Sequence, residues 1–360
     1  MKGKMKAQVF YEPEVMKLEE MDIPQISDDE VLVKVKTAGI CGSDIAYYYG
    51  DSPLDTPDGK GPLILGHEFS GEIVEVGKIP KSLGLFAPGD RLTCNPVQQC
   101  NSCEYCSEGK FNVCPNVTTP GVSADGAFAE YCKMRYTHVY KIPDDMSYET
   151  ASIIEPLACA TYGVNKLDVK PGDFVVVFGS GSIGILMVQL IKARGAGKVA
   201  LVDMSDYKLG IGKEVGADYI LNIKEKQSPN YVDDVVKEIS RLTGGRMADR
   251  VIVPTSAKRA MQEAIDVSGA WATIVYFGLP GPDDKIEVPA LSSIQSDITI
   301  KFSWLAPLVW PQTIRTLGAG LVSVDKIVTH RFSLEQLEEA IEFMKSSPED
   351  KLKGVVVVDE

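Results

Sequence analysis

The chain has 360 residues, of which 44% are hydrophobic, and its formal net charge at pH 7 is −13. This length is enough for two domains with sizeable cores. The negative charge argues against nucleic acid or an anionic membrane as the main partner, because both attract basic patches. The first residues lack the long apolar stretch of a secretory signal, and no run approaches the ~18 apolar residues of a membrane span. Eight cysteines, four of them clustered, favour a reducing compartment, so we expect a cytoplasmic enzyme.

The first 150 residues predict mainly β structure. Residues 31–39 (VLVKVKTAG) and 68–77 (EFSGEIVEVG) alternate apolar and polar side chains, as half-buried strands do. The turn signal PGD at 88–90 precedes a short apolar stretch, and residues 128–134 (FAEYCKM) are another strand candidate. We therefore assign residues 1–153 to one β-rich domain.

Four cysteines in this part follow the spacing C-x2-C-x2-C-x7-C: Cys100, Cys103, Cys106 and Cys114. Four thiolates are the ligand set of a tetrahedral structural Zn²⁺ site, and C-x2-C hooks present their sulfurs from one tight loop. Because the ligands lie within 15 residues, the site needs no long-range folding to assemble. An iron–sulfur cluster and disulfides are the alternatives. The rest of the chain supplies no electron-transfer context, which favours zinc, in a lobe of about residues 94–116.

A second metal site can be inferred from scattered residues. Cys41 opens a CGSD motif after the strand at 31–39, and His67 stands at the entrance of the next strand. Glu155 lies where the β-rich part ends. One cysteine, one histidine and one glutamate suit a catalytic Zn²⁺ whose fourth position stays open for water or substrate. Spacing alone does not show that these residues converge, and a hydrogen-bonded structural histidine is an equally good interpretation of His67.

From about residue 151, strands alternate with helical patterns. Helix 183–194 (IGILMVQLIKAR) is one example, and the alternation is typical of βαβ units in a doubly wound parallel sheet. We assign residues 154–303 to this domain. Residues 304–360 form a last segment, with an amphipathic helix at 334–345 and a final strand at 354–360. The expected strands of the sheet are 174–178, 198–203, 218–223, 250–254, 272–278 and 297–303.

The sequence GSGSIG at 179–184 joins the first of these strands to its helix. Its glycines permit a tight turn and close approach of the backbone to a pyrophosphate, and free N–H groups at the helix N-terminus favour an anion there. Asp203 ends the next strand, 24 residues after Gly179, where its carboxylate would accept ribose hydroxyls and repel a 2′-phosphate. The pattern predicts NAD rather than NADP. The cofactor-binding residues inferred from this loop and strand are Gly179, Gly181, Ser182, Ile183, Gly184 and Asp203.

Three further residues are candidates for cofactor contacts. Lys208 follows Asp203 in the next helix and could lie over the adenosine half, although a solvated lysine is an equally good interpretation. Phe277 and Ser303 stand at the ends of two late strands. Ligands of such sheets bind beyond the carboxyl ends of the strands, so these two are nicotinamide-side candidates, with core packing as the alternative.

Taken together, these motifs resemble the zinc-dependent medium-chain dehydrogenase/reductase family over essentially the whole chain. The matching stretches are CGSD (41–44), GHEFSGEIVEVG (66–77), the four-cysteine lobe, GAFAEY (126–131), EPLA (155–158) and GSGSIG (179–184). The resemblance implies a GroES-like β-rich catalytic domain, completed by the C-terminal segment, with a Rossmann NAD-binding domain inserted between. It also implies a small-molecule substrate and a homo-oligomer, either a dimer or a tetramer.

The resemblance assigns roles to individual residues. It implies that Cys41, His67 and Glu155 ligate a catalytic zinc and that the lobe holds a structural one, so that each chain binds two Zn²⁺ ions. Glu68 can exchange onto the metal in this family, with support of the metal ligands by hydrogen bonds as the alternative. Ser43 matches the hydroxyl that relays the alcohol proton, with a turn hydroxyl that caps the local backbone as the alternative. Glu155, where many simple alcohol dehydrogenases carry a cysteine, points to the polyol branch, similar to sorbitol, threonine and galactitol-phosphate dehydrogenases.

Some features depart from the family pattern. Ala46 stands where many members carry a histidine that conducts the proton onward, which makes a threonine-type substrate less favoured. A sugar-phosphate substrate would need a basic patch, and only Lys60 stands out near the expected cleft. Cys159, one helical turn after Glu155, is a rival metal ligand. The expected activity is therefore reversible hydride transfer between a secondary alcohol of a neutral polyol and NAD, with a non-catalytic NAD(P)H-binding protein as the alternative of another class.

Overall fold

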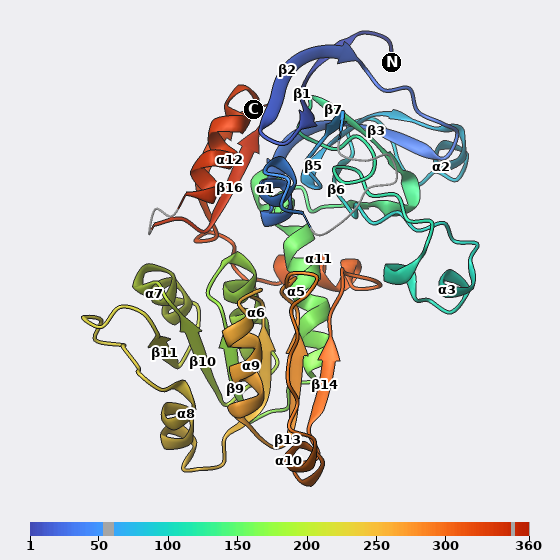
Figure 1. The fold of residues 1–360 in the computed structure, drawn as a ribbon. Helices are drawn as coiled ribbons and strands as arrows, with labels where there is room; N and C mark the ends of the chain where they lie inside the picture. The colour runs from blue at the N-terminus through green and yellow to red at the C-terminus, as the bar shows by residue number, and fades with distance from the viewer. Residues whose placement is uncertain (53–60, 347–349, 360) are drawn as a thin grey trace. The chain divides into compact units, whose positions relative to one another are not determined.

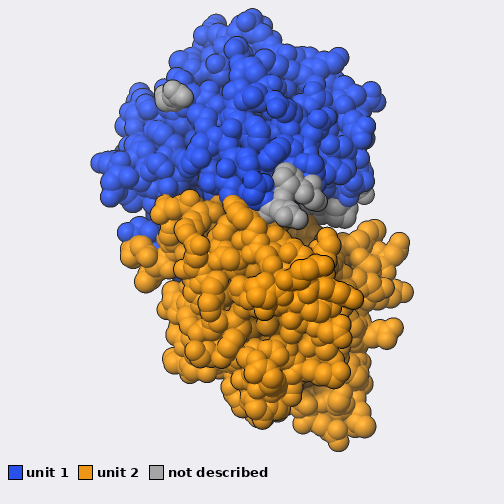
Figure 2. Space-filling view, turned by 90° about the vertical axis from the view of Figure 1, so that its left-hand side faces the viewer, with its two compact units in different colours: residues 1–156, 310–318, 328–360 blue, residues 157–309, 319–327 orange. Residues whose placement is uncertain are grey.

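The structure, a computed structural model, describes residues 1–52, 61–346 and 350–359. The chain forms two compact units, which are coloured separately in Figure 2. Unit 1 comprises residues 1–156, 310–318 and 328–360, and unit 2 comprises residues 157–309 and 319–327. The domain limits inferred from the sequence, after residues 153 and 303, remain a prediction.

Unit 1 is built on two sheets. The larger has the strand order β15-β16-β3-β5-β6-β8, with β7 paired to β3 off this path, and the smaller has the order β2-β1-β4. The strands are β1 (Lys4–Glu12), β2 (Val15–Asp22), β3 (Glu30–Gly39), β4 (Leu63–Ile64), β5 (Glu68–Val76), β6 (Arg91–Cys94), β7 (Tyr131–Arg135), β8 (Val139–Lys141), β15 (Val328–Ser333) and β16 (Lys353–Val357).

Strand β3 is the centre of unit 1. It pairs with β5, β7 and β16, so Val31, Leu32, Val33 and Val35 are all buried. The alternation in the sequence predicts a half-buried strand there. Strand β3 is more deeply buried than this prediction, because neighbouring elements pack on its apolar face and on part of its polar face.

Short helices connect and cover these strands. Helix α1 packs against α12, and α4 packs against β3 and β5. The helices of unit 1 are α1 (Gly42–Tyr48), α2 (Lys78–Ser82), α3 (Glu104–Ser107), α4 (Tyr148–Ser152), the start of α5 (Ile154–Leu167), α11 (Trp310–Gly318) and α12 (Leu337–Lys345), with 3₁₀ turns η1 (Phe111–Val113), η2 (Tyr136–His138) and η3 (Leu334–Gln336).

Unit 2 contains a six-stranded parallel sheet (Figure 1), which confirms the doubly wound fold. Its strand order is β11-β10-β9-β12-β13-β14, the order 3-2-1-4-5-6 of a dinucleotide-binding sheet. Helix α6 covers residues 182–193 against the predicted 183–194. The elements are β9 (Phe174–Phe178), α6 (Ser182–Ala193), β10 (Lys198–Asp203), α7 (Asp206–Glu214), β11 (Tyr219–Asn222), α8 (Val235–Thr243), β12 (Ala248–Val253), α9 (Lys258–Asp266), β13 (Ser268–Tyr276), α10 (Ala290–Gln295) and β14 (Thr299–Phe302).

The first strand of this sheet, β9, has the sequence FVVVF and is buried along its whole length. A strand covered by helices on both faces has no polar side, which is why its sequence does not alternate. Strand order reverses between β9 and β12, so the turn after β9 opens at the position where such sheets bind their ligands. Within the described residues, no helix is both long and apolar enough to cross a membrane.

Candidate active site and metal centres

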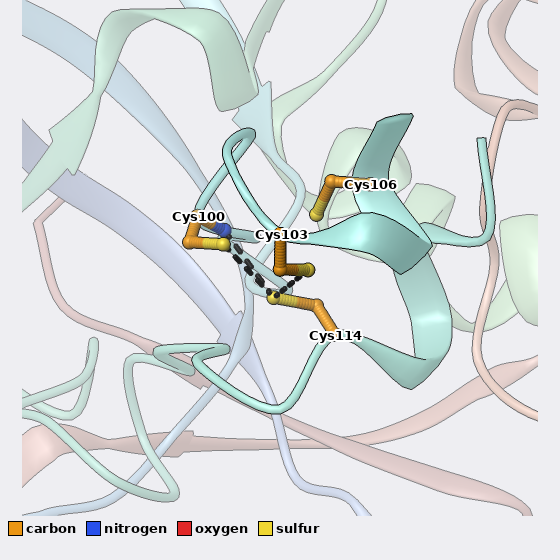
Figure 3. A group of neighbouring side chains, drawn as sticks. All are labelled: Cys100, Cys103, Cys106 and Cys114. Carbon is orange, nitrogen blue, oxygen red and sulfur yellow. Dashed lines mark hydrogen bonds between the residues drawn. The ribbon is translucent and has the colours of Figure 1, made fainter. Parts of the chain in front are cut away.

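The four cysteines of the lobe face one another, as Figure 3 shows. All four sulfurs lie within 4.8 Å of one another. The Sγ atom of Cys114 lies 3.5 Å from that of Cys100 and 3.9 Å from that of Cys103. Four thiolates at about 2.3 Å from a tetrahedral zinc are separated by ~3.8 Å. The donors therefore fit a zinc ion, and their separations are too long for disulfide bonds.

Local hydrogen bonds prepare this lobe for a cation. Backbone and side-chain hydrogen bonds from Ser102 lower the pKa of Cys100 to about 5. Burial, followed by the hydrogen bond with Cys103, raises the pKa of Cys106 to about 12. The four sulfurs cannot all be thiolates without a positive charge among them, and a bound metal ion deprotonates its thiol ligands.

A buried histidine anchors the start of the lobe. His138 Nε2 lies 2.8 Å from Oε1 of Gln99, the residue before Cys100, and its Nδ1 lies 2.9 Å from the Thr137 hydroxyl. Burial, followed by the charge of Arg135, lowers the pKa of His138 to about 4. The ring is therefore neutral and donates from Nε2 to Gln99.

This low pKa predicts a loss of stability in acid. The unfolded chain protonates histidine near pH 6.5, so below that pH the unfolded state binds more protons than the folded state and stability falls until about pH 4. Between pH 7 and pH 5 the free energy of unfolding of the wild type should fall by about 2 kcal/mol because of His138, and this fall should be absent in His138→Gln. Urea unfolding of both proteins at the two pH values measures this. The same pH dependence in both would contradict it.

A second group of ligand atoms lies in unit 1. Cys41, His67 and Glu68 each offer one ligand atom, and these atoms lie within 4.8 Å of one another. Cys41 stands at the N-cap of α1, and Glu68 begins β5 directly after His67. Strand pairing of β3 with β5 brings the two segments together, with Gly39 opposite Glu68. A half-buried thiol, a buried imidazole and a buried carboxylate are together a donor set that fits zinc.

Asp44 organises this group, a role that the sequence interpretation missed. Its carboxylate accepts the Cys41 backbone N–H (2.8 Å) and the Gly66 backbone N–H (3.3 Å), and it lies 3.4 Å from His67 Nδ1. Burial lowers the pKa of His67, but the charges of Asp44 and Cys41 raise it well above the usual value. The negative charges beside His67 thus favour a cation at this ring. A carboxylate on one ring nitrogen leaves the other to face a metal.

Ser43 lies next to the group of Cys41, His67 and Glu68, whereas Glu155 is not among its mutually close ligand atoms. The Ser43 hydroxyl lies 3.4 Å from His67 Nε2, on the side of the ring away from Asp44. Glu155 is buried in the first turn of α5, but the group of mutually close ligand atoms among the described residues contains Glu68 and not Glu155. Cys159 likewise lies outside that group.

The glycine-rich turn has the geometry that the sequence predicts. Gly179 has a φ of +114°, and an added Cβ at Gly184 would overlap the Gly179 carbonyl oxygen. Gly181 is the N-cap of α6, with Ser182, Ile183 and Gly184 in its first turn. Only glycine permits this contact between helix and strand, and the N–H groups of the first turn are left for an anion.

Asp203 is tied to this turn by hydrogen bonds. One carboxylate oxygen accepts the Ser180 backbone N–H at 2.6 Å, and the other accepts those of Met204 (2.7 Å) and Ser205 (3.1 Å). The carboxylate is therefore held in place at the end of β10, and the oxygen that accepts the Ser180 N–H keeps a lone pair for a further donor. Lys208 lies in the first turn of α7, where its backbone N–H donates to Ser205 Oγ.

Phe277 and Ser303 line the same cavity of about 440 Å³ in unit 2, together with Tyr276, Trp304 and others. The Ser303 side chain is buried, and its hydroxyl has no hydrogen-bond partner among the described residues. A buried hydroxyl without a partner costs free energy. The wall of this cavity thus contains one buried hydroxyl that still has hydrogen-bonding capacity.

Comparison with known proteins gives matches to both parts of the chain. Residues 27–144 match the alcohol dehydrogenase GroES-like domain, and residues 182–319 match the zinc-binding dehydrogenase domain. Sorbitol dehydrogenase of Bacillus subtilis is 35% identical over 356 residues, covering 98% of this chain and 97% of that protein.

Solved structures have a fold similar to that of this chain over nearly its whole length. A zinc-binding dehydrogenase of Sinorhizobium meliloti bound to NADP has a TM-score of 0.90 at 28% identity and covers 99% of both chains. An alcohol dehydrogenase of Escherichia coli complexed with NADH has a TM-score of 0.88 at 31% identity and covers 98% of this chain and 99% of its own. Similar folds thus occur with either nicotinamide cofactor.

Proposed function

The chain belongs to the zinc-binding alcohol dehydrogenase family and is an oxidoreductase of the sorbitol dehydrogenase type; on this premise we propose that it transfers hydride reversibly between a secondary alcohol of a neutral polyol and NAD. The observation that carries the proposal is the pair of donor groups in unit 1, one of four cysteines and one of Cys41, His67 and Glu68. A non-catalytic NAD(P)H-binding protein has no need of the second group.

We assign the metals as follows. Cys100, Cys103, Cys106 and Cys114 hold a structural zinc. Cys41, His67 and Glu155 hold a catalytic zinc, and Glu68 is a second carboxylate ligand. When bound, this second ion acts as a Lewis acid on the substrate oxygen. Support for the assignment comes from the donor types and from the closeness of the Cys41, His67 and Glu68 atoms.

The residues around this ion have separate tasks. Asp44 orients the His67 ring through Nδ1. Ser43, with its hydroxyl 3.4 Å from His67 Nε2, accepts the alcohol proton and passes it on. Ala46 has no group to receive that proton, so water or the ribose hydroxyls carry it to solvent.

The cofactor lies along the carboxyl ends of the parallel strands of unit 2. Backbone N–H groups of the turn 179–184 bind the pyrophosphate, Asp203 accepts the adenosine ribose hydroxyls, and Lys208 lies over the adenosine. Phe277 and Ser303 contact the nicotinamide side, where the cofactor offers a partner to the Ser303 hydroxyl, which has none among the described residues. When bound, NAD accepts and returns the hydride.

A substrate panel tests this function. We expect NAD⁺ reduction with sorbitol-like polyols, weaker turnover with threonine or phosphorylated polyols, and at least roughly tenfold lower kcat/KM with NADP⁺, equivalent to about 1.4 kcal/mol. Asp203→Asn removes the negative charge but keeps the size of the side chain. In this variant the ratio of kcat/KM with NAD⁺ to kcat/KM with NADP⁺ should be smaller. No turnover of any secondary alcohol would overturn the proposal.

Assembly is part of the proposal. Strand β14 is at the edge of its sheet, and exposed apolar side chains lie on it and in the segments near it: Trp271, Leu291, Ile294, Phe302 and Leu308. Unpaired edges with apolar surroundings favour pairing with another chain, so we propose a homo-oligomer, which sedimentation would detect.

We also propose a reducing, cytoplasmic location, since none of the eight cysteines is in a disulfide.

A further inference from the structure

The backbone that leads into His67 packs against a later segment of unit 1, which we call the glycine segment, residues 121–131, ending in the stretch GAFAEY. The Gly126 N–H donates to the Ile64 carbonyl at 2.8 Å, and the next N–H donates to the Gly66 carbonyl at 2.9 Å. These hydrogen bonds hold the chain immediately before a metal ligand. The proposed function assigns no role to the GAFAEY stretch, although it lies directly beside the metal centre.

The contact between these two stretches of chain leaves no room for a side chain. Gly121 and Gly126 both face the Gly66 carbonyl, and an added Cβ would lie 2.4 Å and 2.3 Å, respectively, from its oxygen. Gly66 itself has a φ of +91°, which favours glycine, and its own Cβ would lie 2.9 Å from the buried ring of Phe128. Three glycines and one aromatic ring thus enclose the peptide group that joins Gly66 to His67.

The direction of the imidazole depends on this peptide group. The contacts of the ring to Asp44 and to the Ser43 hydroxyl are both 3.4 Å long, longer than most hydrogen bonds, so the backbone supplies much of the restraint. Non-bonded carbon and oxygen atoms meet at about 3.3 Å or more, so a methyl group at position 126 would force the glycine segment and the Gly66 carbonyl apart by about 1 Å. Metal–ligand distances in proteins vary by only about 0.2 Å. The displacement is therefore large compared with what a metal bond tolerates.

We propose that Gly126, supported by Gly121, is a positioning residue of the catalytic metal centre, which fixes the peptide group before His67 and thereby the direction from which the imidazole meets the metal. This inference rests on the proposed function, and it gives a role to the first residue of the GAFAEY stretch. A side chain at position 126 leaves every donor atom in the chain but turns one of them away. The metal is then held less tightly, and the substrate oxygen is presented to it in a poorer geometry.

Gly126→Ala tests this role, because Gly126 lies outside the left-handed region and only the clash is added. Gly77→Ala is the matched control: its Cβ would lie 2.6 Å from a backbone carbonyl oxygen, at the opposite end of β5 from His67. Both variants should be less stable to urea. Zinc release to a chromophoric chelator is followed for both metals in each chain. We expect the catalytic zinc to leave Gly126→Ala at least about tenfold faster, with the four-cysteine lobe unchanged, whereas Gly77→Ala should release both metals as the wild type does.

A milder variant keeps the test decisive if Gly126→Ala does not fold. Asp125 is exposed, and its Oδ1 atom accepts the Ile64 N–H at 3.1 Å. Asp125→Ala therefore removes one hydrogen bond of the glycine segment without adding a clash, and the catalytic zinc should leave roughly threefold faster. Cobalt at the catalytic site gives a second signal, since its visible absorption reports the ligand geometry. The spectrum should change in both variants and not in Gly77→Ala.

A measurement without metal separates this inference from the proposed function. In the metal-free chain, modification of His67 by diethyl pyrocarbonate is followed by mass spectrometry, with His138 and His330 as internal references. The His67 residue is 8% exposed. Its rate of modification should rise several-fold in Gly126→Ala, because the backbone around it opens more readily, while the two reference rates stay those of the wild type.

The outcomes are distinguishable. Release of the catalytic zinc from Gly126→Ala at the wild-type rate, with an unchanged cobalt spectrum, would overturn the role of the glycine. Equally fast release from Gly77→Ala would also overturn it, because the effect would then come from general instability. A wild-type chain that binds only one metal ion would refute the proposed function, and the modification rate of His67 would still decide whether Gly126 positions the ring.

Discussion

Replacing Cys41 by serine should remove one of the two metal ions and reduce NAD⁺-linked polyol oxidation by about 10³-fold or more. The reason is that a hydroxyl is a poor ligand where the site offers a thiolate beside His67 and Glu68. The metal lowers the activation free energy by several kcal/mol, and each 1.36 kcal/mol is a factor of ten in rate. Elemental analysis and initial rates on the same preparation measure both effects.

Matched variants sharpen this result. Cys159→Ser changes a half-buried cysteine outside the group of close donors, and it should keep both metals and the activity. Loss of the catalytic zinc in Cys159→Ser, with zinc retained in Cys41→Ser, would show that the rival ligand is the true one. Glu155→Gln and Glu68→Gln, compared in the same way, identify which carboxylate holds the metal at rest.

Replacing Cys114 by serine should empty the lobe and unfold it. The Cys114 sulfur lies 3.5 Å from that of Cys100 and 3.9 Å from that of Cys103. The lobe between residues 100 and 114 has only α3 and one 3₁₀ turn as regular structure. Structural zinc contributes roughly 10–16 kcal/mol to the folding of small zinc domains. That free energy is comparable to the stability of a whole domain, so we expect the lobe to lose its order without the metal.

The effect of this change should be local at first, because the chain on either side of the lobe is paired through the bridge between Gln98 and Thr118. We expect proteolytic cleavage within residues 100–114, loss of one zinc and a lower melting temperature, whereas NAD binding persists. Limited proteolysis with mass spectrometry locates the cleavage. Ser102→Ala, which removes only a hydroxyl contact to Cys100, is the control that should keep the metal. Resistance of the Cys114→Ser chain to protease would contradict the assignment.

Residues close together in the chain account for most of what could be predicted. The four cysteines fall within 15 residues, so their spacing already limits how far apart the sulfurs can be. The turn 179–184 lies between a buried strand and a helix, and its φ at Gly179 and contact at Gly184 follow from local backbone sterics. The strands and helices of unit 2 are apparent because each carries its own periodicity.

Other features were missed because their sequence signal is weak. The hairpin β1–β2 has a second strand with a single buried position, Met16, so its sequence lacks a clear alternation of apolar and polar residues. Helix α1 is only seven residues long, and its start depends on the hydrogen bond from Cys41 to Asp44. A short helix carries too few residues to show a period of 3.6.

Neighbouring residues encode the fold class, the cysteine lobe and the glycine-rich turn, so each can be predicted from the amino-acid sequence. Which distant residues meet is visible only in the folded chain. Lys353 reaches Glu68 across 285 positions through the pairing of β16, β3 and β5, and His138 supports Gln99 from another strand connection. Such contacts are set by strand register, which is fixed when the whole core packs and not by any local pattern.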